Sequence, residues 1–342
     1  MPASVISRQV DQRLRELYER HNALDDSDVS GYYASLRGLH PPELAGEERD
    51  WFGIALAALD GALHVAGHTE RPFALQSISK VFAYSLALED HGREEVLRYV
   101  GVAPSGDAFN SIVFDERNHR PHNPMVNAGA LVTTNLVRGK DHAERLERIV
   151  DVVRRYAGNP DIDVDRPTYT AELQIADHNR AAAYLMRSQD MLGGDVEEIL
   201  TLYLQQCSIT VTCRDLAMMG ATLANGGVNP VSGERVLARE RVRDVLSVMY
   251  TCGMYDFAGE WAFEIGVPAK SGVSGGVLAA VPGKMGIAVF SPGLDAFGNS
   301  VRGIRVCREI SGRLGLHTFA DESEDTLLRP DQESATQEAA PP

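Results

Sequence analysis

The sequence is short of lysine, cysteine and long apolar runs. Its four cysteines show no C-x-x-C spacing and no dense pattern, which favours reduced, mostly buried thiols. No stretch approaches about 18 uninterrupted apolar residues, and residues 1–25 lack the apolar segment of a secretory signal. We therefore expect neither a membrane span nor export, and a cytoplasmic location.

An excess of positive charge is also missing. The formal net charge is −15, which argues against nucleic acid or an anionic membrane as a partner. Part of this charge is local, because seven acidic residues and one arginine lie between Phe319 and Pro342. We expect residues 319–342 to form an acidic disordered tail. The remaining composition, with 44% hydrophobic residues overall, is typical of a soluble globular protein.

The scarcity of lysine draws attention to the positions where it occurs. The 33 basic residues include only Lys80, Lys140, Lys270 and Lys284, and the others are arginines, which cannot act as bases. Two of the four stand in candidate site motifs, Ser77-Ile78-Ser79-Lys80 and Lys270-Ser271-Gly272. A serine and a lysine three residues apart share one face of a helix, so the amine can approach the hydroxyl. A desolvated lysine can then take the proton of the serine.

The surroundings of Ser77 fit this chemistry. Its backbone N–H would lie at a helix N-terminus, where unpaired N–H groups favour an oxyanion. A second cation from Lys270 close by would disfavour protonation of Lys80. S-x-x-K followed far downstream by K-S/T-G is the arrangement of the serine β-lactamase and penicillin-binding fold. Because S-x-x-K alone occurs by chance in roughly one such sequence in four, the two motifs leave an acylating serine hydrolase and coincidence equally open.

The hydrophobic patterns predict an α+β fold. Residues 51–59 and 62–66 read as strands joined by the turn dipeptide Asp60-Gly61, and residues 277–281 and 285–289 read as further antiparallel strands. Val10, Leu14 and Leu17 predict an N-terminal helix, and a last helix is predicted over 299–314. We therefore expect a β-lactamase/penicillin-binding-like architecture, in which an antiparallel sheet built from both chain ends carries an inserted helical lobe.

The middle of the chain is mostly helical in pattern. A helix from Ser77 is predicted to end at His91-Gly92, and a bend at residues 120–130 opens into another helix. Glu172 and Asn179 are seven residues apart, which predicts one helical face for both. Within a single domain of residues 1–318, we expect the sheet lobe at about 1–80 and 228–318 and the helical lobe at about 81–227.

Several blocks of the chain, in order, resemble the serine-dependent glutaminase family of bacterial and kidney/liver-type enzymes. The resemblance runs from about Gly31 to His317 and is far more specific than S-x-x-K alone. The blocks are Gln76–Lys80, His122–Ala130, Tyr203 with Gln206-Cys207-Ser208, Cys252–Tyr255 and Ala269–Val273.

This resemblance implies the fold, the reaction and the site. It implies a β-lactamase-like fold, hydrolysis of L-glutamine to L-glutamate and ammonia without metal or organic cofactor, and a homodimer or homotetramer. It makes Ser77 the nucleophile, Lys80 its base and Tyr255 the proton shuttle to the leaving ammonia, with Lys270 in support. The substrate-binding residues that it implies are Tyr32, Gln76, Asn127, Glu172, Asn179, Tyr203 and Val273, the last through its backbone N–H in the oxyanion hole.

These assignments have plainer alternatives. Asn127 could cap a helix, Glu172 could be a solvated acid, and Tyr203 and Tyr255 could be a core and a turn aromatic. Tyr33 is adjacent to Tyr32 and competes with it as the site tyrosine.

Two other activities compete with glutamine hydrolysis. A β-lactam or D-Ala peptide amidase is disfavoured by the missing export signal and the absence of an S-D-N block. A non-catalytic glutamine-binding protein would need a broken nucleophile, whereas Ser77, Lys80 and Tyr255 are all present.

Overall fold

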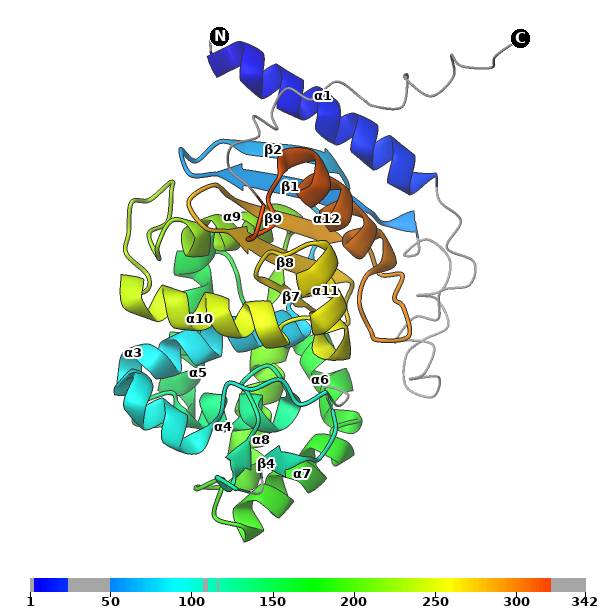
Figure 1. Ribbon diagram of the computed structural model, residues 1–342. Helices are drawn as coiled ribbons and strands as arrows, with labels where there is room; N and C mark the ends of the chain where they lie inside the picture. The colour runs from blue at the N-terminus through cyan, green and yellow to red at the C-terminus, as the bar shows by residue number, and fades with distance from the viewer. Residues whose placement is uncertain (1–2, 24–49, 107–109, 116, 321–342) are drawn as a thin grey trace, which may run out of the picture.

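A five-stranded antiparallel sheet joins the two ends of the chain (Figure 1). The structure is a computed structural model that describes residues 3–23, 50–106, 110–115 and 117–320. Neighbouring strands follow the order β2-β1-β9-β8-β7 and pair antiparallel throughout. The prediction of a sheet built from both chain ends is confirmed. Its strands are β1 (Gly53–Ala58), β2 (Leu63–Gly67), β7 (Ala269–Ser271), β8 (Gly276–Val281) and β9 (Met285–Phe290).

Both faces of the sheet are buried, because each strand alternates its apolar side chains between two cores. Along β8, Val277, Ala279 and Val281 contact one core, and Leu278 and Ala280 contact the other. In Figure 1 the helices that share a core with Val277, Ala279 and Val281 lie on the opposite side of the sheet from α9. These helices are α1 (Ala3–Asn22), α11 (Ala258–Glu264) and α12 (Val301–Leu314), and α9 spans Cys213–Ala224.

The helix α9 packs closely on the strand β9. A Cβ added at Gly286 would stand 2.1 Å from the carbonyl oxygen of Ala217, so only glycine permits this approach. The N-terminus of α9 is determined locally, since Thr212 and Asp215 form a capping box there. This helix therefore connects the sheet to the helical part of the molecule.

The remaining helices form the lower part of Figure 1. Asp141, Asp165 and Asp195 each cap one of them by accepting a hydrogen bond from a backbone N–H three residues on. The helices are α3 (Ser79–Tyr99), α4 (Asn127–Leu136), α5 (His142–Ala157), α6 (Arg166–Gln174), α7 (Asp177–Ser188), α8 (Val196–Cys207) and α10 (Arg239–Cys252), with short 3₁₀ turns η3 (Gln76–Ile78) and η4 (Tyr255–Phe257). Short strand pairs join β3 (Phe73–Ala74) to β6 (Thr210–Val211) and β4 (Phe114–Asp115) to β5 (Arg120–Pro121).

One local prediction was confirmed and one was wrong. The helix that follows Ser77 ends at Gly92, which has a positive φ of 77°, and a second helical segment beyond this kink completes α3 to Tyr99. Glu172 and Asn179 lie on two helices, α6 and α7, because Ile175 leaves the helical conformation between them. Seven-residue spacing cannot detect a break of this kind, since the apolar pattern continues across it.

Some predictions lie outside the described residues. Tyr32 and Tyr33 belong to this group, and so does the acidic segment from residue 321 onward. The division into a sheet lobe and a helical lobe at the stated boundaries stays a prediction. Among the residues that the structure describes, no helix has both the length and the apolar character needed to cross a membrane.

Candidate active site

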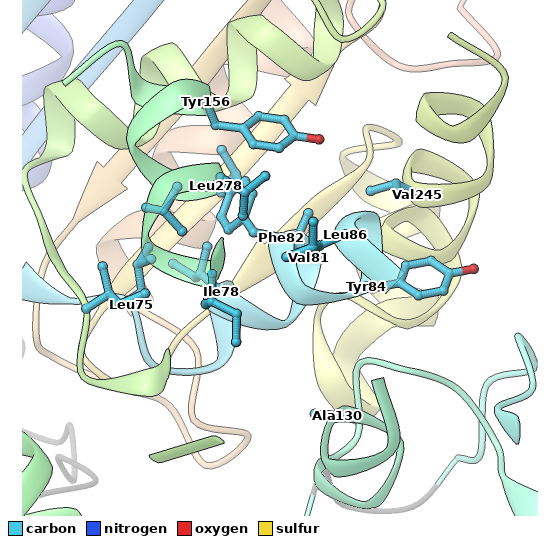
Figure 2. Close-up of a cluster of buried hydrophobic side chains, with 14 of the residues drawn as sticks. Leu75, Ile78, Val81, Phe82, Tyr84, Leu86, Ala130, Tyr156, Val245 and Leu278 are labelled. Carbon is cyan, nitrogen blue, oxygen red and sulfur yellow. The ribbon is translucent and has the colours of Figure 1, made fainter. Parts of the chain in front are cut away.

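Ser77 lies on the 3₁₀ turn η3, directly before α3. Leu75 and Ile78, which flank it, are fully buried in the core, and Figure 2 shows them beside Val81 and Phe82 of α3. The regular α-helix begins at Ser79, two residues later than the predicted start near Ser77. Ser77 therefore stands at the N-terminal end of α3, where backbone N–H groups lack intrahelical partners.

Lys80 is fully buried on the first turn of α3. Its Nζ donates to Oδ1 of Asn127 at 2.6 Å and to the carbonyl oxygen of Met125 at 3.3 Å. Burial lowers the pKa of Lys80 to about 8, and the nearby Cys207 thiol opposes this effect. The side chain is therefore partly neutral near pH 8, which a lysine in water is not.

Lys270 lies on β7 and is also fully buried. Its Nζ donates to the carbonyl oxygen of Ser271 at 2.8 Å and lies 3.9 Å from the ring centroid of Tyr255. Burial and the charge of Lys80 lower the pKa of Lys270 well below the usual range. The two lysines thus share a site, and the repulsion between them disfavours a state in which both are charged.

Tyr255 follows α10 on η4, with a positive φ of 57°. Its hydroxyl donates to the carbonyl oxygen of Ser271 at 3.2 Å. Burial raises the pKa of Tyr255 to about 12, and hydrogen bonds with Ser77 and Ser271 oppose this rise. The tyrosine is therefore protonated at neutral pH and hydrogen-bonded to the candidate nucleophile.

Asn127 connects three of the predicted site residues. Its Oδ1 accepts from Lys80 and, at 3.3 Å, from the hydroxyl of Tyr203, while its Nδ2 donates to Oδ1 of Asn179 at 2.9 Å. Asn127 is the first residue of α4, and Val126, not Asn127, precedes the helix as its cap. The bend before α4 needs glycine, because a Cβ at Gly129 would lie 1.9 Å from the carbonyl oxygen of Asn123.

Glu172 reaches the same region from α6. Its Oε1 accepts from Nε2 of Gln76 at 2.9 Å, which ties the acid to the residue before Ser77. Tyr203 is almost fully buried, and this burial raises its pKa well above the usual range. The structure therefore brings Gln76, Asn127, Asn179 and Tyr203 together with Glu172, although they come from five different elements.

Val273 lies in the turn between β7 and β8. This turn passes close to η3, because a Cβ added at Gly272 would lie 2.8 Å from the carbonyl oxygen of Leu75. Among the described residues the Val273 N–H has no hydrogen-bond partner, whereas the neighbouring Gly272 N–H donates to the carbonyl oxygen of Gly276 at 2.9 Å. Within the described part of the chain, Val273 thus has an unpaired backbone donor in a turn that packs against η3.

Met125 and Cys207 also lie in the site, although the sequence predicted no role for either. Met125 supplies a carbonyl acceptor to Lys80, and the Cys207 thiol lies 3.9 Å from the hydroxyl of Ser79. Burial raises the pKa of Cys207 to about 11, so its thiol is neutral. Both residues lie inside the motif blocks noted above, and this was the only sequence signal for them. Residue type alone does not reveal that a backbone carbonyl accepts a hydrogen bond or that a cysteine is buried.

A cavity of about 290 Å³ adjoins the site. Its walls include Met125, Val126, Cys252 and Tyr255. This volume is at the small end of the range for ligand pockets, which fits a small molecule. Among the described residues no group of three histidine, cysteine or acidic side chains is placed to hold a metal ion.

The fold and the site together define a class of protein. An antiparallel sheet, a helical region and a buried Ser77-x-x-Lys80 segment facing Lys270-Ser271-Gly272 are the features of the β-lactamase-like fold. Within this class the match is to the family model described as Glutaminase, over residues 39–319. The chain belongs to the glutaminase family.

Individual relatives agree with this assignment. The glutaminase of Trichormus variabilis is 52% identical over 306 residues, which are 90% of this chain and 89% of that protein. Glutaminase 2 of Clostridium perfringens is 47% identical over 280 residues, covering 81% of this chain and 92% of its own.

Solved structures give the same answer. A probable glutaminase of Bacillus subtilis matches with a TM-score of 0.81 at 32% identity, over 90% of this chain and 96% of that one. Mglu in its tris and glutamate form matches with a TM-score of 0.84 at 44% identity, over 92% of this chain and 68% of that one. The predicted family and fold class are confirmed.

Proposed function

We propose that the protein hydrolyses L-glutamine to L-glutamate and ammonia through an acyl-enzyme on Ser77. The observation that carries this proposal is the fully buried Lys80, whose pKa is lowered to about 8 and which lies one helical turn from Ser77. Family membership supports the substrate. Mglu, a structural neighbour, was solved in a glutamate form, which supports recognition of the product.

The contacts of Lys80 explain how it would act as a base. A neutral amine has two N–H donors and one lone pair. Asn127 and Met125 accept the two N–H groups, so the lone pair is left to receive the proton of the Ser77 hydroxyl. The serine oxygen then attacks the side-chain carbonyl carbon of glutamine, and the backbone N–H groups of Ser77 and Val273 stabilise the oxyanion.

Tyr255 would complete the reaction as a proton donor. Its hydroxyl remains protonated because its pKa is raised, and it is hydrogen-bonded with Ser77. As the carbon–nitrogen bond breaks, Tyr255 passes a proton to the leaving nitrogen and regains one from Lys80. Water then hydrolyses the acyl-enzyme, which releases L-glutamate and restores Ser77.

The substrate clamp follows from the charges of free glutamine. Its α-ammonium group needs an anion, and Glu172 supplies one, while its α-carboxylate needs neutral donors such as Asn127, Asn179 and Tyr203. These donors already hydrogen-bond with one another, so their side chains are oriented before substrate arrives. A cytoplasmic location and a homodimer or homotetramer stay predictions.

The proposed reaction is tested by ammonia release from the purified protein. L-Glutamine should be hydrolysed, and L-asparagine and a chromogenic β-lactam should not be. Preference for the β-lactam would instead identify an amidase of the wider fold class. Binding of L-glutamine without turnover would identify a non-catalytic binding protein.

Glu172→Gln is expected to weaken substrate binding much more than it weakens folding. The change removes the charge that pairs with the α-ammonium, a loss on the order of 2–5 kcal/mol in a desolvated contact. It keeps an amide oxygen that can still accept from Gln76. Calorimetry with L-glutamate and a thermal melt measure the two effects.

The control for this variant is Glu240→Gln, because Glu240 is exposed on the first turn of α10, away from the site. It should leave binding and melting temperature unchanged. If Glu172→Gln instead unfolds, or binds L-glutamate normally, Glu172 is a structural acid.

The activity is expected to rise with pH through about 8, because Lys80 must be neutral to act as a base. A base with a pKa of about 8 predicts that kcat/KM increases about fivefold from pH 7 to pH 8 and levels off above pH 9. Tyr255 would not add an alkaline limb in this range, since its pKa is about 12.

Initial rates measured from pH 6 to pH 9.5 check this expectation. Lys284→Met, at an exposed lysine, is the matched control and should show the same profile as the unmodified protein. A flat profile between pH 7 and pH 9 would assign the base to another group.

A further inference from the structure

The residue before Ser77 has an unusual backbone. Gln76 has a φ of 49°, in the left-handed region that residues other than glycine rarely adopt. Such a conformation is unfavourable by itself and persists only where surrounding contacts hold it. Because Gln76 and Ser77 are adjacent, the conformation of Gln76 orients the backbone of Ser77, from which the Ser77 hydroxyl projects. The contacts that hold Gln76 therefore bear directly on the reaction.

A buried chain of hydrogen bonds ends on the Gln76 carbonyl. The Thr134 hydroxyl donates to Oε1 of Gln206 at 3.0 Å, and Nε2 of Gln206 donates to the Ser79 hydroxyl at 3.2 Å. The Ser79 hydroxyl in turn donates to the carbonyl oxygen of Gln76 at 2.7 Å. Thr134 and Gln206 are 0% exposed and Ser79 is 1% exposed. The chain runs through three helices, α4, α8 and α3.

The chain has a single direction. A serine hydroxyl carries one proton, and the Ser79 oxygen already accepts from Gln206. Its own proton is therefore directed to the Gln76 carbonyl at 2.7 Å, which is a nearer and stronger acceptor than the Cys207 sulfur at 3.9 Å. Hydrogen bonds in a dry interior strengthen one another when they run head to tail. Without Gln206 the Ser79 hydroxyl would lose this fixed orientation. The shortest of the three bonds is the one that touches the left-handed residue.

Gln76 also links this chain to the substrate clamp. Its side chain donates to Oε1 of Glu172 at 2.9 Å, while its carbonyl is held by Ser79. One residue thus connects the position of Ser77 to the position of the acid that faces the substrate ammonium. A shift of its backbone would move both.

We infer that Thr134, Gln206 and Ser79 are positioning residues, which hold Gln76 in the left-handed conformation that aims Ser77 at the substrate carbonyl. This inference rests on the proposed role of Ser77 as the nucleophile. It predicts that the hydroxyl of Ser79 contributes to kcat although it does not touch the reacting atoms. It also predicts that the three side chains act as one unit.

The first test compares two buried serines of α3. Ser85 matches Ser79 closely, since it is 1% exposed and donates to the carbonyl oxygen three residues earlier, that of Phe82, at 2.8 Å. Ser79→Ala should lower kcat about 10- to 100-fold, as expected for a small misplacement of a reacting group. Ser85→Ala should keep kcat within about twofold, although both variants lose one buried hydrogen bond of similar strength.

A second test examines the unit. Gln206→Met and Thr134→Val replace the polar groups with apolar ones of similar size. The loss of kcat should be largest for Ser79→Ala, smaller for Gln206→Met and smallest for Thr134→Val. Adding Gln206→Met to Ser79→Ala should lower kcat by less than about threefold, because the chain is already broken. L-Glutamate affinity, measured by calorimetry, and KM for L-glutamine should change much less than kcat in each variant.

Equal kcat values for Ser79→Ala and Ser85→Ala would overturn the inference, and so would losses that multiply fully in the double variant. A fall in kcat that follows the loss of melting temperature across all the variants would assign the chain to stability alone. If Ser79→Ala does not fold, the conservative Thr134→Val still carries the test. Ser77→Ala serves as the reference: if it retains activity, the proposed nucleophile is wrong, whereas an inactive Ser77→Ala with a normal Ser79→Ala refutes only the positioning chain.

Discussion

Ser77→Ala is expected to abolish hydrolysis of L-glutamine while the substrate still binds. The hydroxyl supplies the attacking oxygen, whereas the contacts assigned to binding come from Glu172, Asn127, Asn179 and Tyr203 on other helices. Calorimetry measures L-glutamine binding by the variant, and an ammonia assay measures its turnover. Removing one small hydroxyl should leave the fold intact.

Ser188→Ala is the matched control, because Ser188 is an exposed serine at the end of α7. It should have the activity of the unmodified protein. Residual steady-state activity of Ser77→Ala above about one part in a thousand would contradict the assignment, since binding and an oxyanion hole alone do not sustain more turnover than this without the nucleophile.

Val273→Pro is expected to lower kcat about 10²- to 10³-fold, the usual loss when one oxyanion donor is removed. The proposed role of Val273 lies in its backbone N–H, which has no partner among the described residues and which proline lacks. Val273→Ala keeps the N–H and removes only two methyl groups. It should therefore be nearly silent for catalysis.

The proline variant must be shown to be folded before its rate is interpreted, because proline also restricts the preceding Gly272. Native circular dichroism and normal L-glutamate binding meet this condition. A folded Val273→Pro enzyme with near-normal kcat would place the oxyanion donor elsewhere. A large loss in Val273→Ala would instead show that the side chain, which is 5% exposed, packs against the site.

The two buried lysines illustrate how the fold adjusts residue chemistry. Neither Lys80 nor Lys270 forms an ion pair among the described residues; their amines are held by carbonyl oxygens instead. Carbonyl groups satisfy the N–H donors without supplying the negative charge that would stabilise a cation, so burial lowers both pKa values. Two adjacent buried cations would repel each other, so the charge of Lys80 further disfavours protonation of Lys270.

Much of the architecture was predictable from local patterns. Short apolar runs bounded by turn residues identified β1, β8 and β9, since a strand buried on both faces is apolar along nearly its whole length. The recurrence of Val10, Leu14 and Leu17 identified α1 in the same way. The S-x-x-K motif could be interpreted because residues three apart on a helix share a face whatever the rest of the fold does.

Other features of the site could not be derived from spacing. Glu172 and Asn179 were predicted on one helix, yet they reach the site from α6 and α7, because a break after Gln174 leaves no trace in the apolar pattern. The left-handed Gln76 was not predicted either. Its conformation is held by Ser79 and, through it, by Gln206, a residue 130 positions away from Gln76 in the chain.

The sequence by itself thus determined the family, the strand and helix pattern, and the residue types available for catalysis, because these depend on short-range periodicity and on motif blocks. Tertiary structure alone decided what those residues can do. The lowered pKa of Lys80, the contact between Lys270 and Tyr255, and the hydrogen bonds that converge on Asn127 all arise between different elements of the fold. Desolvation and hydrogen-bond geometry depend on which groups surround a side chain, and only the folded packing of α3, α4, α8 and β7 supplies those neighbours.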